Sequence, residues 1–401
     1  MYLRNNRVGI FDLSSNESSE QELGDEANWD RLSALYIAEK LASEHGTDSL
    51  VLGTGVLTSS FVPAACAGIV RGSPGKNGDP RVMPLLGFAG VELKLTGFDF
   101  IVVKGASESP GYVWVRDGIT EFVESEEMKS KDSWARTDKI RADQGDNKIQ
   151  VLSNGPWGDS VNPASQLITD YWGGEDKSGL GADLGRKNLL AIAFRGMGEL
   201  ELSEPDGHLQ DSMVLMAEHI QRLGKNEGLA SYSKALERED FKKLLHRNIA
   251  CYGCPFPCRS FLKTSEPANE MKLVANEPGY LHYDIPALEK AFALGFDAMD
   301  ATMALMKCAR AGAEPVSVLS YAAERSARVN MSSVAEVLSD PSSVSQCRAV
   351  GNFELSFDDR AQYRSCLGLG LCPRYWSKVG YDEAAVTPYG EAALGLSSHS
   401  K

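Results

Sequence analysis

The sequence predicts an α+β protein, with a sheet-rich amino-terminal domain at residues 1–205 and a mainly helical carboxy-terminal region at residues 206–401. Between residues 53 and 97 glycines recur every few positions, which favours short strands joined by tight turns over long helices. After residue 205 apolar residues recur every three or four positions, which is the period of an amphipathic helix. This change of pattern sets the predicted boundary.

Local patterns indicate the individual elements. Residues 8–13 and 100–103 predict strands, and a helix is expected at residues 31–41 because its apolar residues have helical spacing. The Asp117-Gly118 pair predicts the turn of a hairpin at residues 112–123. A further strand is expected at residues 190–194, and helices at residues 210–223, 236–245, 287–310 and 316–327.

Length and charge limit the functional classes. A chain of 401 residues is long enough for two or three domains and can bury a core without disulfide bonds. The net charge of -14 argues against nucleic acid or an anionic membrane surface as a partner, because both would repel the chain. The first residues lack an apolar signal core, and no apolar run reaches the roughly 18 residues of a membrane helix. We therefore expect a cytoplasmic protein without membrane insertion.

Three of the eight cysteines lie in one short stretch, Cys251, Cys254 and Cys258. Their C-x2-C-x3-C spacing allows three thiolates to converge on one face of a tight loop, and Gly253 permits an unusual backbone turn there. In a reducing compartment, clustered cysteines are more often metal ligands than disulfide partners. The stretch therefore predicts a metal site that needs a fourth ligand.

The best candidate for the fourth ligand is Cys372, which lies in another glycine-rich turn closed by a proline; Cys366, Cys308 and Cys347 are its rivals. Three close cysteines with a distant fourth fit an iron–sulfur cubane better than structural zinc, whose four-cysteine sites usually combine two C-x2-C pairs. Zinc remains one alternative, and buried structural or thioredoxin-like thiols are another.

Several stretches together resemble the aldehyde ferredoxin oxidoreductases. In the first half they are residues 52–58, 90–99, 155–158 and 185–192, with the Asp-Gly hairpin at 117. The loop at residues 251–258 is similar to the cluster loop of that family, and residues 369–372 are similar to the segment that supplies its fourth ligand. The resemblance covers most of the chain and thins after about residue 260.

The resemblance implies a fold, a chemistry and a set of partners. The sheet-rich half would be the family's pterin-binding type of amino-terminal domain, carrying a tungsten or molybdenum bis-pyranopterin beside one [4Fe-4S] cluster. The implied cluster ligands are Cys251, Cys254, Cys258 and Cys372. The implied reaction oxidises an aldehyde or reduces a related carbonyl or acyl compound. Electrons would pass singly through the cluster to ferredoxin or to a partner redox subunit.

The chain departs from the family at the pterin-binding positions. Two D-x-x-G-L motifs align with residues 294–297 and 369–372, and their first aspartates become Phe292 and Leu367, which cannot accept hydrogen bonds. The basic loop R-A-A-G-R-G-G aligns with residues 173–179, whose only cation is Lys177.

That same loop adds Glu175 and Asp176 where phosphates would approach. The family's N-S-G-G loop aligns with residues 85–88, which read Leu-Leu-Gly-Phe. The segment between the cysteine loop and Cys372 is also much shorter than in full-length members of the family.

The cofactor-binding candidates each have a structural alternative. Lys177, Gly179 and Gly181 could cradle phosphate, or the glycines could only turn the chain, which we favour. Lys94 could face a cofactor or be a solvated strand lysine. Asp297 keeps the second acid of a D-x-x-G-L-D motif but also suits a helix surface.

No catalytic residue is assigned from the sequence. The six histidines show no metal-ligand spacing, and only His282, among aromatic neighbours, is a candidate for proton transfer, with a structural histidine the favoured interpretation. Two hypotheses remain. The chain is a shortened oxidoreductase with pterin and cluster, or a pterin-less relative that transfers electrons or supports a larger redox complex. The substrate, a small aldehyde or acyl compound in the first case, and the oligomeric state stay open.

Overall fold

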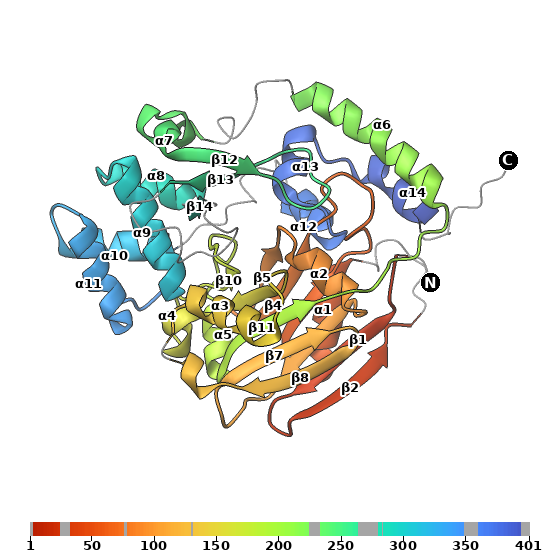
Figure 1. Cartoon of the computed structure of the whole chain (residues 1–401), viewed down its shortest axis with the longest axis horizontal. Helices are drawn as coiled ribbons and strands as arrows, with labels where there is room; N and C mark the ends of the chain where they lie inside the picture. Colours follow the sequence, from red (N-terminus) through yellow and green to blue (C-terminus); the bar gives the residue numbers. More distant parts are fainter. Residues whose placement is uncertain are drawn as a thin grey trace.

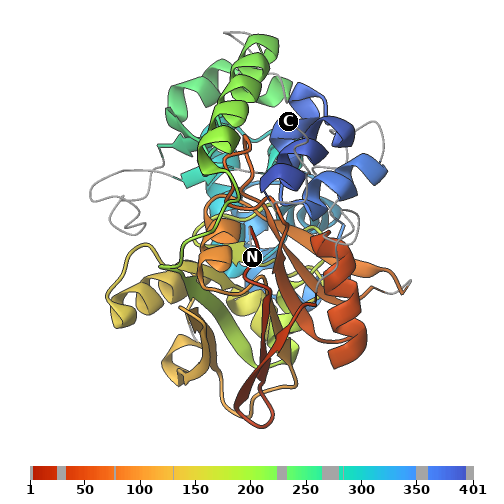
Figure 2. The same cartoon turned by 90° about the vertical axis from the view of Figure 1, so that its right-hand side faces the viewer.

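The protein combines two sheets with a set of later helices. The computed structural model describes residues 3–24, 33–75, 78–129, 131–223, 233–263, 280–282, 284–348 and 360–393. The sheets lie together at one end of the molecule, and the later helices lie against them (Figures 1 and 2). This confirms the predicted α+β class. Within the described ranges, no helix has both the length and the apolar character needed to cross a bilayer.

Six strands form the first sheet, in the spatial order β2-β1-β6-β3-β4-β5. β1 and β6 are parallel, and the other neighbouring strands are antiparallel. β3 is buried along its whole length and β6 along most of it, because helices and the second sheet cover their faces. The bounds are β1 (Arg7–Asp12), β2 (Glu17–Glu22), β3 (Leu50–Thr54), β4 (Gly68–Pro74), β5 (Pro80–Leu85) and β6 (Phe100–Lys104), with α1 (Ala34–His45) and α2 (Ala89–Leu95) packed against them.

Five strands form the second sheet, in the order β10-β9-β11-β7-β8. Asp117 and Gly118 join β7 to β8 with positive φ angles of 41° and 78°, as a type I′ hairpin turn requires, so the predicted hairpin is confirmed. Buried apolar side chains from both sheets form a shared core. The bounds are β7 (Gly111–Arg116), β8 (Ile119–Glu124), β9 (Gln150–Ser153), β10 (Ile168–Thr169) and β11 (Leu189–Arg195), with the helices η2 (Glu126–Met128), α3 (Ser133–Gln144), α4 (Gly155–Asp159) and α5 (Gly181–Arg186).

The second half is mainly helical and contains one small antiparallel sheet, β12-β13-β14. The helix predicted at residues 236–245 is shorter than expected, because the chain enters β12 at Leu245. The bounds are α6 (Pro205–Leu223), η4 (Lys234–Glu237), α7 (Glu239–Leu244), β12 (Leu245–Ile249), β13 (Arg259–Leu262), β14 (Tyr280–His282), α8 (Ile285–Ala293), α9 (Ala298–Ala311), α10 (Pro315–Arg325), α11 (Met331–Ser339), η6 (Pro341–Ser343), α12 (Arg360–Gly368), α13 (Pro373–Val379) and α14 (Glu383–Ala393).

The single helix predicted at residues 287–310 is two helices, α8 and α9. Gly295 has a φ of +92°, which favours glycine, and it ends the first helix. Asp297 then caps the second helix, because its carboxylate accepts the N–H of Asp300 at 2.8 Å. The prediction of one continuous helix was therefore wrong, because Gly295 ends α8 and Asp297 starts α9.

The later helices form two groups around two cores. Helices α8 to α11 pack together around one core, which also includes Trp134 and Trp157 from the first half. Helices α12 and α13 lie with α1, α6 and the first sheet around the other core. This second core contains Cys66, Cys251 and Cys372, so the cysteine loop lies where the first sheet meets the last helices.

Candidate metal centre

The three clustered cysteines lie in the loop that connects β12 to β13. Cys251 and Cys258 are buried, and Cys254 is partly exposed. The N–H of Cys254 donates to the carbonyl of Cys251 at 3.2 Å, which closes a tight turn. Gly253 has a φ of +59°, and a Cβ at this position would meet nothing within 4 Å, so glycine serves the backbone conformation rather than space.

Cys372 reaches the same site from the start of α13. Gly370, two residues earlier, has a φ of +92°, and a Cβ there would lie only 2.2 Å from Oγ1 of Thr58. The N–H of Cys372 donates to the carbonyl of Ala64 at 2.9 Å, and the N–H of Ala64 donates to the carbonyl of Gly253 at 3.0 Å. A segment of the sheet-rich half therefore joins the two cysteine-bearing segments.

The pKa values of the thiols report how closely they interact. A hydrogen bond with Cys66 is the largest influence on Cys251 and lowers its pKa to about 6. Burial is the main reason that the pKa values of Cys254 and Cys258 are raised, and the charges of Cys251 and Cys372 act in the same direction; the pKa of Cys258 becomes about 12. The structure thus brings together all four cysteines that the sequence indicates as ligands.

Two buried arginines supply positive charge to this group of thiols. Arg259 and Arg374 are each only 4% exposed. The largest influence on the pKa is the hydrogen bond with Cys66 for Cys251 and burial for Cys258. In addition, the charges of the two arginines lower the pKa of both thiols. Four cysteine thiolates on a cubane carry net negative charge, so buried cations beside them offset part of the cost of that charge. The donor set and its surroundings fit an iron–sulfur cluster.

The geometry does not show a site for one ion. Among the described residues, no three or more His, Cys, Asp or Glu side chains are placed to hold a single metal ion. In a cubane each cysteine binds a different iron atom, so its four sulfurs surround a cluster rather than one point.

The other cysteines differ in their surroundings. Cys66 was not singled out in the sequence, where no spacing pattern links it to the loop, yet it lies beside Cys251 and Cys372. Cys366 is buried in α12, and its thiol donates to the carbonyl of Leu371 at 3.6 Å. Cys308 and Cys347, the remaining rivals for the fourth position, pack in the other helical core.

The interpretation of Lys94 as a solvated strand lysine was wrong. Lys94 lies in the helix α2 and is only 1% exposed. Its ammonium group forms an ion pair with Asp99 at 2.7 Å and donates to the carbonyl of Gly55 at 3.4 Å. The protein itself therefore neutralises this cation, which leaves it poorly suited to hold a cofactor phosphate.

Lys177 is also neutralised from within. It forms ion pairs with Asp284 and, at 3.0 Å, with Glu314, and all three side chains are buried. Burial opposes its charge, but the two carboxylates outweigh burial and raise the pKa of Lys177. This lysine connects the loop to the start of α8 and α10.

The glycine-rich loop already holds an anion, the carboxylate of Asp176. It accepts the N–H groups of Leu167, Ser178, Gly179 and Leu180 at 3.0, 2.9, 3.1 and 2.8 Å. Phosphate-binding loops present such N–H groups to a ligand. Because the protein's own carboxylate occupies them, this loop does not fit a pterin phosphate.

The remaining cofactor candidates have structural roles. Gly179 has a φ of +81°, and a Cβ there would lie 2.2 Å from the carbonyl oxygen of Pro163. A Cβ on Gly181 would lie 2.9 Å from Ser165 and from the carbonyl oxygen of Gln166. Asp297 is the exposed cap of α9 described above. His282 belongs to β14, and its side chain lies outside the described part of the structure.

Glu175 connects the glycine-rich loop to the thiols. It is 5% exposed, and in the described structure its Oε2 has no hydrogen-bond partner. Burial raises its pKa to about 8; the charges of Arg374 and Arg259 oppose this rise, and the charge of Cys251 adds to it. Glu175 is therefore close enough to the cysteine site for its charge to interact with Cys251, Arg259 and Arg374.

A cavity of about 230 Å³ lies next to the cysteine loop. Three arginines line it, Arg141, Arg247 and Arg259, against one carboxylate, Asp170, which pairs with Arg141 at 2.9 Å. Arg259 directly follows Cys258 in the chain. The balance of charge suits a small anionic ligand.

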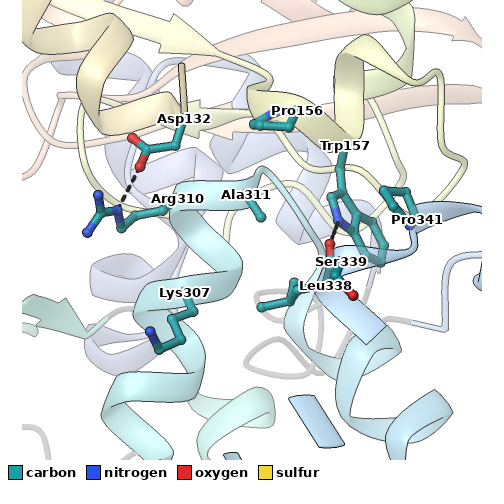
Figure 3. A pocket seen from close by; sticks show the side chains of 9 residues that line it. All are labelled: Asp132, Pro156, Trp157, Lys307, Arg310, Ala311, Leu338, Ser339 and Pro341. Carbon is teal, nitrogen blue, oxygen red and sulfur yellow. Dashed lines mark hydrogen bonds and ion pairs between the residues drawn. The ribbon is translucent and has the colours of Figure 1, made fainter. Parts of the chain in front are cut away.

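A second cavity, of about 410 Å³, lies between α4, α9 and α11 (Figure 3). Arg310 pairs with Asp132 at 2.8 Å on one side, and Trp157 donates to the carbonyl of Leu338 at 3.2 Å on the other (Figure 3). No cysteine lines it, and two of its polar side chains, Asp132 and Arg310, pair with each other.

Comparison with known proteins agrees with the fold of the sheet-rich half. Residues 9–196 match the family model for the N-terminal domain of aldehyde ferredoxin oxidoreductase. The sheet-rich half is therefore such a domain, in a protein with a thiol-lined centre beside it. This match confirms, for the amino-terminal half, the resemblance to the aldehyde ferredoxin oxidoreductase family that the sequence motifs predict.

The curated relatives are longer than this chain. The tungsten-containing aldehyde ferredoxin oxidoreductase of Thermococcus kodakarensis is 27% identical over 303 residues, which are 64% of this chain and 49% of the relative. That of Pyrococcus furiosus is 26% identical over 244 residues, 53% of this chain and 40% of the relative. The chain thus spans about half or less of the length of these relatives.

Two further matches are parts of complexes by their descriptions. The WOR-like subunit of an aliphatic sulfonate oxidoreductase from P. furiosus is 24% identical over 258 residues, 56% of this chain and 39% of that subunit. The active-site complex BamBC of benzoyl coenzyme A reductase, solved with 1,5-dienoyl-CoA, shares the fold with a TM-score of 0.65 at 16% identity. The alignment covers 98% of this chain and 61% of that one.

Proposed function

We propose that this chain is an iron–sulfur oxidoreductase component in which Cys251, Cys254, Cys258 and Cys372 hold one [4Fe-4S] cluster. The observation that supports this most is the gathering of four thiols from two distant segments in one buried site. Such a cluster supplies one-electron transfer when bound.

The residues of the chain have distinct parts in that function. The loop and the α13 turn would orient the four sulfurs, and burial excludes water from Cys251, Cys258 and Cys372. Arg259 and Arg374 offset the negative charge of the site. Cys254 is the partly exposed member, so electrons would enter or leave on its side.

We propose that the chain acts as an electron-transfer subunit of a larger redox complex. The carboxylate of Asp176 fills the loop that would take a pterin phosphate, and Lys94 and Lys177 are paired internally. The similarity to a WOR-like subunit and to a BamBC chain supports a protein partner, a second redox subunit or ferredoxin.

A second candidate function is direct oxidation of an aldehyde or reduction of an acyl compound with a tungsten or molybdenum pterin. The cavity beside the cysteine loop favours it, because its three arginines could take a phosphate or carboxylate group. The family relationship supports the same chemistry.

Anaerobic purification followed by elemental analysis separates the candidates. About four iron atoms per chain with neither tungsten nor molybdenum is the result we expect for an electron-transfer subunit. Stoichiometric tungsten or molybdenum would support the second candidate instead. A folded, anaerobically reconstituted protein without iron would contradict both.

We also propose a cytoplasmic location and the two-part organisation at residues 1–205 and 206–401. All eight cysteines are free thiols, which suits a reducing compartment. The proposed boundary coincides with the first residue of α6, Pro205.

A further inference from the structure

A segment of the first half runs between the two cysteine-bearing segments. The N–H of Ala67 donates to the carbonyl of Gly370 at 2.9 Å, and Ala64 bonds to both Gly253 and Cys372 as described above. The indole N–H of Trp376, in α13, donates to the carbonyl of Pro63 at 3.0 Å. Residues 63–67 are therefore held firmly against both sides of the site.

This segment places the Cys66 thiol inside the site. Cys66 is fully buried, and its thiol is in hydrogen-bond contact with the thiols of Cys251 and Cys372. All three cysteines belong to the same buried core.

The number of thiols exceeds what a cubane uses. A [4Fe-4S] cluster takes four thiolates, which the loop and Cys372 already supply. Cys66 then keeps its hydrogen, and its nearest sulfur neighbours are the first and the fourth ligands. An S–H group is a weak donor, but a charged acceptor strengthens the hydrogen bond.

We propose that Cys66 is a positioning residue of the cluster site that donates an S–H hydrogen bond to the ligand sulfurs of Cys251 and Cys372. This proposal rests on the proposed function. Reduction adds one negative charge to a cluster, so a donor aimed at its ligand sulfurs stabilises the reduced state more than the oxidised state. Cys66 therefore raises the reduction potential of the cluster.

The test is a redox titration of the anaerobically reconstituted full chain, followed by electron paramagnetic resonance. Cys66→Ala removes the donor, Cys66→Ser keeps a hydroxyl donor, and Cys308→Ala is a control that removes a buried thiol from the other core. All variants should bind about four iron atoms. In Cys66→Ala the equilibrium constant for reduction should fall on the order of tenfold, about 59 mV for a one-electron couple.

The other variants complete the expected result. Cys66→Ser and Cys308→Ala should have the wild-type potential or, for the serine variant, a slightly higher one. If the alanine variant does not fold because it leaves a cavity, Cys66→Val removes the donor while filling the space of the thiol and takes its place.

Three outcomes would count against the proposal or its basis. An unchanged potential in Cys66→Ala would show that the thiol only packs. Loss of an iron atom in that variant would show that Cys66 is itself a ligand, which also overturns the donor role. Absence of iron from the wild-type chain would instead overturn the proposed function, so the two failures are distinguishable.

Discussion

The main-chain N–H of Cys372 donates to the carbonyl of Ala64 at 2.9 Å, which ties the last helices to a segment of the sheet-rich half. Ala64 also donates to Gly253 in the cysteine loop. One residue of the amino-terminal half is therefore bonded to both cysteine-bearing segments. The site is built jointly by the two halves of the chain.

Gly370 should be far less tolerant of substitution than Gly253. In Gly370→Ala the new Cβ would lie 2.2 Å from Oγ1 of Thr58, and the alanine would have to keep a left-handed backbone conformation. In Gly253→Ala the alanine would also be left-handed, but its Cβ would meet no atom within 4 Å. The left-handed conformation costs about 1–2 kcal/mol, and the clash adds to it at Gly370. Urea unfolding of both variants measures the difference, and iron content shows whether the site survives. Equal losses of stability would contradict the described packing.

Asp176→Asn should destabilise the fold although its shape hardly changes. Each carboxylate oxygen accepts two N–H groups, and an amide NH₂ in place of one oxygen would face two donors. An unsatisfied buried group costs about 1–3 kcal/mol. Denaturant unfolding measures the loss, with Asp297→Asn as an exposed control expected to change little. An Asp176→Asn variant as stable as wild type would contradict the assignment of these four N–H groups to the carboxylate.

Glu175 should make stability depend on pH. Its folded pKa, about 8, lies above the ordinary value of 4.5, so between these values the folded state binds more protons than the unfolded state. Below pH 4.5 Glu175 is protonated in both states and does not lower the free energy of unfolding. As the pH rises from 4.5 toward 8, Glu175 lowers the free energy of unfolding more and more. Glu175→Gln should gain stability over wild type at pH 7.5, by up to a few kcal/mol, and little at pH 5.

Thermal or urea unfolding of the metal-free chain at the two pH values tests this prediction. A gain that is the same at pH 5 and pH 7.5 would show that Glu175 does not titrate in this range.

Much of the fold followed from local patterns. The Asp117-Gly118 turn and the apolar periodicity after residue 205 depend on neighbours in the sequence, so the hairpin and the helical half were predictable. The break between α8 and α9 was also local, since Gly295 followed by Asp297 is a stop and start signal that the helical period obscured.

The site was predictable only where its residues cluster in the sequence. The C-x2-C-x3-C spacing of the loop is visible in the sequence. Cys66 has no spacing relation to this loop, so the sequence analysis missed it. Lys94 and Lys177 look like ligand-binding residues until their buried partners are known. Their roles depend on burial and on long-range contacts that no local pattern contains.

The iron content of Cys372→Ala, compared with Cys366→Ala, tests the central claim most directly. Both residues are buried in the same core, but only Cys372 is assigned as a ligand. After anaerobic reconstitution, wild type and Cys366→Ala should hold about four iron atoms with the broad visible absorbance of a cubane, and Cys372→Ala should lose iron and that absorbance. A Cys372→Ala variant that keeps all its iron and an unchanged spectrum would contradict the account.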